Sequence, residues 1–258
     1  MKRAVLAITL ALVIRLPIPV SAAPPPPLAN APRADLWITD DPVVDAEVVG
    51  DLAYISGMAS VGPFTGLAAR LDPVSGATLP PFPRLDGDVA AGVLASAPDG
   101  SGGWFLGGSF IQADGVTRRG LAHVLPDGTL DAKWAPQADG AVNALVLSGT
   151  TVYIGGAFAT VDGVARSHLA ALDATTGALT PWNPGADGPV YCLAALGETL
   201  YVGGAFQQAG GQYRPYAAQL DLATGQATWW NPLSDGPVHA LALGGSALYV
   251  GGHFSAIG

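Results

Sequence analysis

The 258-residue chain is poor in cysteine and in charge. Its single cysteine, Cys192, cannot form a disulfide within the chain, and its apolar surroundings predict a buried, inert thiol. Only 12% of the residues are charged, and 20 acidic residues face 11 basic ones, a net charge of −9. This acidic surplus argues against binding to nucleic acid or to anionic membranes, because both require basic patches.

Motifs of catalytic and metal sites are also missing. The four histidines, His123, His168, His239 and His253, form no H-x-x-x-H pair and no Cys/His cluster, which argues against zinc. The sequence contains no G-x-S-x-G nucleophile elbow, no D-x-D-x-D-G calcium loop and no phosphate-binding G-x-x-x-x-G-K. We therefore predict no catalytic residue, no metal and no cofactor.

The N-terminus has the three parts of a secretion signal. Lys2 and Arg3 supply positive charge, an apolar run extends to Ile14, and small residues precede a cleavage position after Ala22. A membrane anchor is the alternative, but the apolar run is shorter than the roughly 20 residues that a span needs. We expect residues 1–22 to be a signal peptide.

The sequence after Ala22 is expected to be the mature protein. Without the leader the chain keeps 8 basic and 20 acidic residues, a net charge of −12, and we expect no membrane span in it. The proline run Pro24–Pro27 predicts an extended linker over residues 23–35. We expect the mature protein to be secreted, periplasmic or located at the cell surface.

A repeat of 48 residues organises the remainder of the chain. The most visible column is a double glycine inside an apolar segment, found as Gly107-Gly108, Gly155-Gly156, Gly203-Gly204 and Gly251-Gly252. Two further columns keep the same spacing, namely Arg118, Arg166 and Arg214, and Trp134, Trp182 and Trp230. An older copy precedes these, with Ser56-Gly57 at the place of the double glycine. A fixed period in several independent columns is typical of a repeat architecture.

Each unit is expected to form four short antiparallel strands. In the third unit these are Val142–Leu147, Thr151–Phe158, Leu169–Asp173 and Ala178–Trp182. Four strands within about 40–50 residues are typical of a β-propeller blade, whereas β-helix coils are shorter and immunoglobulin domains longer. The glycine pair indicates a bulge or a close approach between backbones. We predict an all-β, propeller-like array of four-stranded antiparallel blades.

The period sets the unit boundaries within residues 36–258. The predicted units are 43–88, 89–141, 142–189, 190–237 and a partial unit 238–258. Two interpretations of the half unit remain. The chain is a fragment with further blades or domains downstream, which we favour because capping features are missing, or residues 34–38 pair with the half unit and close a small five-bladed ring.

Several segments carry a resemblance to a known repeat. They are Leu200–Phe206, then Arg166 with Leu169–Gly177, then Trp182–Pro184 with Asp187–Val190. Together they are similar to the delta-60 type propeller repeats of exported bacterial proteins, which are related to the propeller of fungal cortical polarity markers. The resemblance spans about residues 43–258 and implies a modular surface or secreted protein without a shared active site.

A second, narrower resemblance covers Gln219–Trp229, which looks like the tryptophan-docking motif of quinoprotein propellers. In that motif the tryptophan stacks between blades. A quinone-dependent dehydrogenase would also need calcium ligands and usually a vicinal cysteine pair. The resemblance therefore implies a propeller and not redox chemistry.

Two charged columns are candidates for ligand binding. Asp139, Asp187 and Asp235 each precede a glycine and could be ion ligands, but we favour caps of their own turns. The arginine column could form a ring of cations, yet its regularity favours scaffold bonds to carboxylates or carbonyls in the same or the next blade.

One column varies where the others repeat. The second residue of the innermost strand is Val44, Ala90, Asn143, Tyr191 and His239 in successive units. Innermost strands line the channel where propellers bind ligands. We hypothesise that Asn143, Tyr191 and His239 are ligand-binding residues facing the channel; drift at a tolerant position is the alternative.

These observations favour an exported, non-enzymatic module that binds or scaffolds a protein or glycan partner. One alternative is an enzyme on a propeller scaffold, either a quinoprotein-like oxidoreductase or a carbohydrate-active enzyme. Clustered carboxylates or metal ligands on one face would favour that alternative. The other is a structural repeat region of a large surface adhesin. Fold alone does not choose among the three.

Overall fold

The computed structural model describes residues 43–49, 52–57, 67–88, 91–245 and 247–258. The expected signal peptide and linker, and Ala90, lie outside these ranges. Contacts separate Met1–Asp35 from Leu36–Gly258, and all described elements belong to the second unit. Every regular element in the described ranges is a β-strand, so this part of the chain is all-β as predicted.

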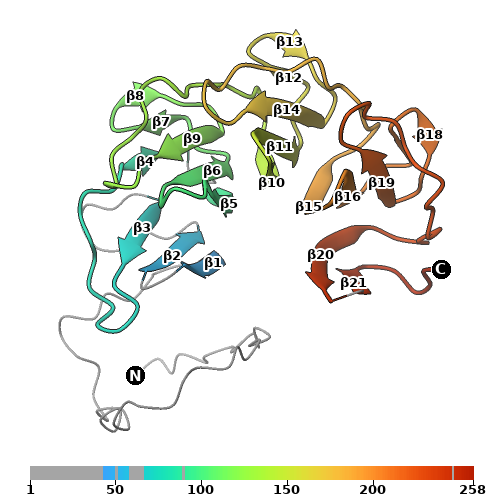
Figure 1. Cartoon of the computed structure of the whole chain (residues 1–258), viewed down its shortest axis with the longest axis horizontal. Helices are drawn as coiled ribbons and strands as arrows, with labels where there is room; N and C mark the ends of the chain where they lie inside the picture. The colour runs from blue at the N-terminus through green and yellow to red at the C-terminus, as the bar shows by residue number, and fades with distance from the viewer. Residues whose placement is uncertain (1–42, 50–51, 58–66, 89–90, 246) are drawn as a thin grey trace, which may run out of the picture. The chain divides into compact units, whose positions relative to one another are not determined.

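The strands form a row of small antiparallel sheets that follow one another in chain order (Figure 1). The first strand of each sheet contacts the first strand of the next sheet, so these strands form the inner edge of the row. They are β1 (Val43–Val49), β5 (Val93–Pro98), β10 (Val142–Ser148), β15 (Val190–Leu196) and β20 (Val238–Gly244).

The second strand of each sheet pairs with the first and carries the glycine column. These strands are β2 (Leu52–Gly57), β6 (Trp104–Gly108), β11 (Thr151–Gly156), β16 (Thr199–Gly204) and β21 (Ala247–Gly252). Four sheets have a third strand on the other side of the second. These strands are β3 (Ala68–Leu71), β9 (Leu121–Val124), β14 (Leu169–Asp173) and β19 (Ala217–Asp221).

The expected fourth strand is reduced to a single bridge. Leu172 bridges Leu179 in the third sheet, and the same bridge recurs as Leu71 with Thr78, Val124 with Leu130, and Leu220 with Ala227. Pro181 has no N–H to donate, and the carbonyl of Thr180 accepts from Arg166 instead of a strand. The sheets are therefore three-stranded ladders with a tightly turned outer segment, a correction to the four-stranded prediction.

Short hairpins connect the second and third strands. They are β7 (Gln112–Ala113) with β8 (Val116–Thr117), β12 (Thr160–Val161) with β13 (Val164–Ala165), and β17 (Gln208–Ala209) with β18 (Gln212–Tyr213). In addition, β4 (Leu85–Asp86) pairs with β7. The repeat did not predict these hairpins, because their two-residue strands are shorter than any hydrophobic period.

The double glycine lies opposite a β-bulge. In the third sheet Gly156 is the partner of Val142 and Gly155 is the partner of Ala144, so Asn143 is an extra residue on the inner strand. The same shift occurs in all five sheets that contain an inner strand, including the first, where Ser56 and Gly57 take the glycine positions. The predicted bulge is thus confirmed, and it lies on the partner strand.

The two glycines of each pair have different tasks. A Cβ on Gly156 would collide with the carbonyl of Ala141, which precedes the inner strand of the same sheet. A Cβ on Gly203 would lie 2.6 Å from Cγ1 of Val238, the first residue of the next inner strand. The second glycine allows the bulge, and the first allows the next sheet to pack closely.

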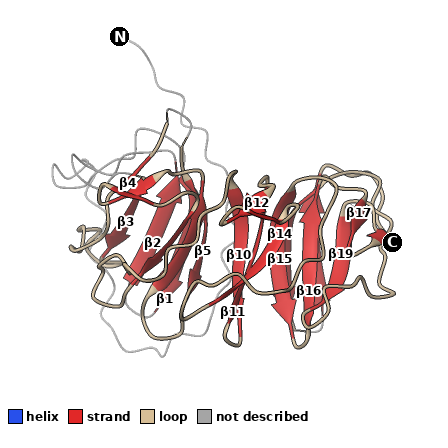
Figure 2. Ribbon diagram, turned by 90° about the horizontal axis from the view of Figure 1, so that it is seen from above, coloured by secondary structure: helices blue, strands red, loops and turns tan. Residues whose placement is uncertain are grey.

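The sheets stand side by side in the ribbon view (Figure 2). Clusters of buried hydrophobic side chains join one sheet to the next and form the core. One cluster joins Phe105 and Leu121 of the second sheet to Ile154 of the third, and all three are almost fully buried. The next cluster joins Tyr153 of the third sheet to Val202 of the fourth. Full burial of one such side chain stabilises a fold by about 1.5–3 kcal/mol, so each sheet depends on its neighbour.

Candidate functional site

The extra residue of each bulge forms the variable column. These residues are Val44, Leu94, Asn143, Tyr191 and His239. The register corrects one assignment, because Leu94 and not Ala90 holds this place in the second sheet. A bulged residue is left out of the ladder pairing, so its identity can change without loss of a cross-strand partner.

Four bulge residues line a single cavity along the inner strands. Leu94, Asn143, Tyr191 and His239 contribute to its wall, and its volume is about 420 Å³. They come from β5, β10, β15 and β20. Leu94 and His239 are 145 residues apart in sequence, but each of these strands contacts the next one in space. The structure therefore brings the three predicted site residues together.

The cavity wall has an aromatic part and an amide. The rings of Tyr191 and His239 are stacked, with centroids 4.8 Å apart and an interplanar angle of 6°. His253 meets His239 edge-on at 4.7 Å. Asn143 donates from Nδ2 to the carbonyl of Val190 over 2.9 Å, while its Oδ1 has no protein partner in the described ranges. This wall offers aromatic surface and a hydrogen-bond acceptor to a ligand.

Cys192 also lines this cavity and is half-buried, not fully buried as expected. Burial raises the pKa of its thiol to about 12, and a hydrogen bond from the Gly203 backbone lowers it only in part. A thiol with this pKa is protonated at neutral pH and is a poor nucleophile. The prediction of an unreactive thiol therefore agrees with this environment.

The arginine column forms scaffold bonds. Arg166 donates from Nη1 to the carbonyl of Ala165 and from Nη2 to that of Thr180, both over 2.8 Å. Arg118 and Arg214 make the corresponding bonds within their own units. The interpretation of these arginines as links to carbonyls of the same blade agrees with these contacts. The guanidinium groups hold the outer segment against the connecting hairpin.

The Asp-Gly column also has a structural task, but a different one from that predicted. Asp187 does not cap its own turn; its Oδ1 accepts from the backbone N–H groups of Gln207 (2.7 Å) and Gln208 (2.8 Å), 20 residues downstream. Asp139 and Asp235 repeat this arrangement. Hydrogen bonds from Thr160 and Ala159 outweigh desolvation and lower the pKa of Asp139. The glycine after each Asp allows the downstream loop to approach.

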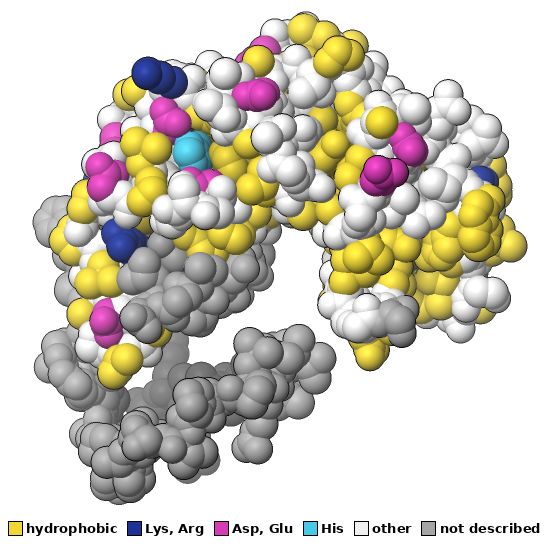
Figure 3. All heavy atoms as spheres, viewed as in Figure 1, with side chains coloured by type: hydrophobic (Ala, Val, Ile, Leu, Met, Phe, Trp, Pro, Cys, Tyr) yellow, Lys and Arg dark blue, Asp and Glu magenta, His cyan; other side chains and the backbone are white. Residues whose placement is uncertain are grey.

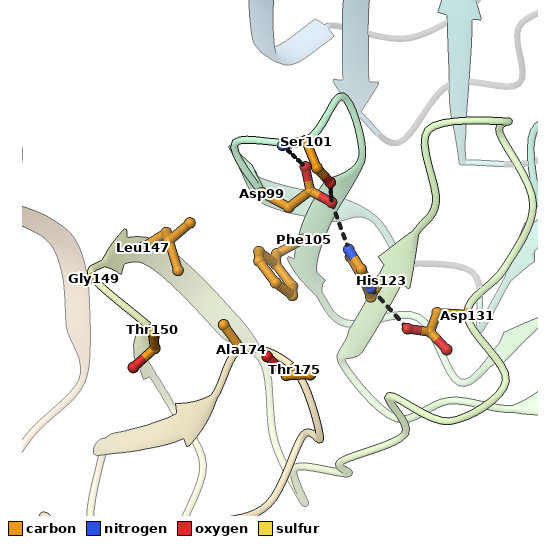
Figure 4. A pocket seen from close by; sticks show the side chains of 10 residues that line it. All are labelled: Asp99, Ser101, Phe105, His123, Asp131, Leu147, Gly149, Thr150, Ala174 and Thr175. Atoms are coloured by element: carbon orange, nitrogen blue, oxygen red, sulfur yellow. Dashed lines mark hydrogen bonds and ion pairs between the residues drawn. The ribbon is translucent and has the colours of Figure 1, made fainter.

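A second pocket, of about 380 Å³, contains a cluster that the sequence analysis missed (Figure 4). His123 on β9 lies between two carboxylates. Its Nε2 is 3.1 Å from Oδ2 of Asp99, and its Nδ1 is 3.0 Å from Oδ2 of Asp131. The imidazole stacks on Phe105, with ring centroids 4.4 Å apart. All three polar side chains are largely buried.

Other donors already occupy both carboxylates. Asp99 accepts from the hydroxyl and the N–H of Ser101 and from the N–H of Gly103. Asp131 accepts from the N–H groups of Lys133 and Trp134. A neutral imidazole has one N–H and donates to one carboxylate only, whereas an imidazolium donates to both.

The chemistry of this cluster is limited by its geometry. Ser101 donates to Asp99 and makes no hydrogen bond to His123, so the pocket lacks a serine–histidine pair. In the described ranges, no group of three or more His, Cys, Asp or Glu residues is arranged to hold a metal ion. The cluster ties the loop before β6 to β9 and to the turn after it.

A sequence signal for His123 exists in the third strand. In the second sheet His123 pairs with Phe105. The residues at the same third-strand position of the other sheets differ, and they pair with a tyrosine of the second strand: Arg70 with Tyr54, Ala171 with Tyr153, and Gln219 with Tyr201. This second variable column was overlooked because Arg70 and His123 belong to the two less regular units.

Comparison with known proteins supports the fold. Residues 98–133 match the family described as "Domain of unknown function (DUF5122) beta-propeller", a segment that contains Asp99, His123 and Asp131. No curated protein matches the chain. Within the described ranges there is also no helix with the length and hydropathy that a membrane crossing requires.

Three solved structures are similar to the chain at low sequence identity. The computationally designed Ika4 protein is 17% identical with a TM-score of 0.48, and the match covers 73% of this chain and 96% of Ika4. The designed Ika8 protein is 16% identical with a TM-score of 0.46 over 81% and 67%. The Neurospora crassa Pan2 WD40 domain is 12% identical with a TM-score of 0.46 over 74% and 50%. The described part of the chain is all-β, and the family match over residues 98–133 supports a propeller-like fold.

Proposed function

We propose that the chain is an exported, non-enzymatic propeller module that binds a protein or glycan partner through the cavity lined by Leu94, Asn143, Tyr191 and His239. One observation carries this proposal. Each unit repeats its scaffold residues but differs at the bulge, and the bulge residues of four units meet in one cavity. Positions that face a ligand are free to differ where scaffold positions are not.

The chemistry of the cavity suits such a ligand. Aromatic faces pack against the C–H surfaces of sugars and against peptide side chains, and they lose little conformational entropy on binding. The stacked pair Tyr191 and His239 supplies this surface, and Oδ1 of Asn143 supplies an acceptor for a hydroxyl or an amide N–H.

A non-enzymatic role is favoured over a propeller-scaffold enzyme. Asp99 and Asp131, with His123 between them, are the clustered carboxylates that would favour an enzyme, but both already accept hydrogen bonds from His123 and from neighbouring backbone groups. Burial raises the pKa of the Cys192 thiol, which disfavours the nucleophilic thiolate form at neutral pH.

Export is proposed on the charged, apolar and small-residue segments of residues 1–22, and it agrees with the resemblance to delta-60 type repeats of exported bacterial proteins. Expression of the full chain in a bacterial host, with mass spectrometry of the product, tests this. We expect cleavage after Ala22 and no cleavage in an Ala22→Arg variant. A full-length cytoplasmic product from the natural sequence would refute export.

Binding is tested by screening the purified full chain on a glycan array and against a displayed peptide library. A triple variant, Asn143→Ala, Tyr191→Ala and His239→Ala, is expected to lose at least tenfold in affinity, as expected when about 1.4 kcal/mol is removed. The matched control is Tyr213→Ala, an exposed aromatic on the outer hairpin. Full binding by the triple variant, with an unchanged melting temperature, would exclude the cavity.

A further inference from the structure

Two exposed aromatic side chains lie at the outer edge of the fourth sheet. Tyr213, on β18, is 60% exposed, and Trp229, which follows the bridge between Leu220 and Ala227, is 88% exposed. Hydrophobic side chains gather on the surface around this sheet, at the right of the space-filling view (Figure 3). Tyrosine and tryptophan are enriched at interaction surfaces, so this edge is a candidate binding surface.

Trp229 has no packing task between units, which corrects the docking motif that the sequence analysis ended at this residue. The tryptophans that pack between units belong to the 48-residue column. Trp134 and Trp182 are buried, and each donates from Nε1 over 3.2 Å to a backbone carbonyl of the next unit. Trp230 is the member of that column in the fourth unit, whereas its neighbour Trp229 lies outside the column.

One guanidinium group holds the backbone beneath both exposed aromatic residues. Arg214 donates from Nη1 to the carbonyl of Tyr213 over 2.8 Å and from Nη2 to that of Thr228 over 2.6 Å. Thr228 turns its hydroxyl inward and donates to Gln219 over 2.7 Å, while the next side chain, Trp229, is exposed. The two aromatic side chains therefore start from neighbouring pieces of backbone that a single residue fixes.

The same arginine clamp recurs in two earlier units without aromatic side chains. Arg118 and Arg166 hold the corresponding carbonyls. The positions that match Tyr213 and Trp229 are occupied by Thr117 and Lys133 in the second unit and by Ala165 and Pro181 in the third. All four are exposed, although a further unit packs against each of these two units. Exposure at these places is thus a property of the scaffold, and of the three units the fourth places aromatic rings there.

The polar groups beside the aromatic pair are mostly amides. Tyr213 donates from its hydroxyl to Oε1 of Gln207 over 3.4 Å, and Nε2 of Gln207 has no acceptor in the described ranges. Gln208 is the cross-strand partner of Tyr213. Five of the seven glutamines of the chain fall within residues 190–237, so amides are concentrated in this unit. An amide both donates and accepts hydrogen bonds, as hydroxyl groups do.

The charged groups of this region are directed elsewhere or engaged with the backbone. Glu198 and Asp221 lie at the end of the sheet away from the β17–β18 hairpin. Arg214 points both Nη atoms at backbone carbonyls. Asp187 and Asp235 accept from backbone N–H groups of the loops that follow them. This edge therefore favours a neutral partner, because charged partners are attracted by unpaired charge of the opposite sign.

The hairpin that carries Tyr213 also borders a cavity of about 370 Å³. Ser167, Asp187 and Gln208 contribute polar groups to its wall. The preceding unit has a cavity of about 410 Å³ at the same place, where Arg119 replaces Ser167. The scaffold thus repeats this recess, and beside the aromatic pair it is lined by groups that bond hydroxyls.

We propose that Tyr213, Trp229 and the adjoining cavity form a second binding surface, separate from the cavity of the inner strands, and that its ligand is a neutral polysaccharide. Sugar rings offer C–H faces to aromatic rings, and their hydroxyls match the amides and the hydroxyl of Ser167. A folded protein partner would need about 800 Å² with an apolar centre, whereas these rings are set among amides. A polymer suits an edge on which both rings are open to solvent.

Affinity gel electrophoresis of the full chain tests this, with xyloglucan, laminarin, dextran and galactomannan as neutral probes and alginate as the charged probe. We expect at least one neutral polysaccharide, and not alginate, to retard the protein. Trp229→Ala and Tyr213→Ala are each expected to weaken binding at least tenfold, and Trp229→Phe less. The control is Val164→Ala, which removes an exposed apolar side chain of the preceding hairpin and should bind as the natural chain does.

Fluorescence gives a direct second readout. The emission of the exposed Trp229 is expected to move to shorter wavelength when polysaccharide covers it, and Trp229→Phe should abolish this shift. No retardation by any neutral probe, or equal retardation of Trp229→Ala and the natural chain, would overturn the proposal. An equal loss with Val164→Ala would do the same.

The two proposed surfaces serve as controls for each other. The triple variant of the inner cavity should bind polysaccharide at this edge as the natural chain does. Tyr213→Ala and Trp229→Ala should leave the ligand of the inner cavity bound. Failure of one proposal therefore leaves the other standing.

Discussion

His123 Nδ1 lies 3.0 Å from Oδ2 of Asp131, inside the second unit and against the ring of Phe105. Removal of the imidazole by His123→Ala would leave two buried carboxylates without their shared partner. We expect the free energy of unfolding to fall by about 3 kcal/mol, the range found when a buried pair loses one member. Urea denaturation measures this.

The matched control for this substitution is Gln219→Ala, because Gln219 holds the same third-strand position. Its side chain makes hydrogen bonds to Thr199 and Thr228. Loss of these neutral bonds is expected to destabilise by about 1 kcal/mol. Equal effects of the two substitutions would contradict a special role for the His123 network.

The same cluster predicts a dependence of stability on acid. Burial raises the pKa of Asp99, but hydrogen bonds from Ser101, His123 and Gly103 outweigh it, so the net pKa lies below 3.8. Burial likewise raises the pKa of Asp131, and the bond to His123 leads the opposing effects, again giving a lowered value. A carboxyl with a depressed folded pKa stabilises the fold above its unfolded pKa and loses this contribution as the pH falls through the folded value.

We therefore expect the melting temperature to be flat with respect to these two groups above about pH 5 and to drop below about pH 4. An Asp99→Asn variant should lose stability at neutral pH and show a shallower drop in acid. Calorimetric melts from pH 7 to pH 3 measure both; parallel curves for the two proteins would contradict the assignment.

The glycine column offers a matched pair of substitutions. A methyl group at Gly203 would lie 2.6 Å from Sγ of Cys192 and from Cγ1 of Val238. Gly203→Ala is therefore expected to destabilise by about 1–3 kcal/mol through overpacking. Gly251→Ala meets nothing closer than 3.7 Å and should be neutral or slightly stabilising. Thermal melting distinguishes them, and equal melting temperatures would argue against the packing role of the first glycine.

Leu233 has a backbone conformation that glycine adopts more easily. Its φ is 50°, and the residue 48 positions earlier is Gly185 with φ 64°. Positive φ costs an L-residue roughly 1–2 kcal/mol, and glycine avoids this cost. Glycine also raises the conformational entropy of the unfolded chain, which offsets part of the gain. Leu233→Gly is therefore expected to raise the free energy of unfolding by up to about 1 kcal/mol. The reciprocal Gly185→Leu should lower stability, and a gain from it would refute the argument.

Much of the fold follows from the period. The strands expected at Val142–Leu147 and Leu169–Asp173 appear as Val142–Ser148 and Leu169–Asp173, because apolar strand residues bounded by Gly and Asp turns are strong local signals. The outer strand was overestimated, since Arg166 competes for its carbonyl and proline interrupts it. The partner of Asp187 was missed because a bond across 20 residues has no local signature.

Of the two candidate sites, one could be predicted from the sequence and the other could not. Asn143, Tyr191 and His239 were found from one column, since the period alone aligns them. The cluster of Asp99, His123 and Asp131 depends on a pairing register and on two irregular turns, and neither is visible in the spacing of the repeat.

The bulge opposite each glycine pair also separates two kinds of position on the inner strand, those in the ladder and the one outside it. A ladder residue has a cross-strand neighbour that its replacement disturbs, whereas the bulged residue has no such neighbour and can be replaced alone. A combinatorial library randomised at Leu94, Asn143, Tyr191 and His239 would thus vary one continuous surface while the backbone stays constant. By the same reasoning, duplication of a unit adds an independently tunable position to that surface.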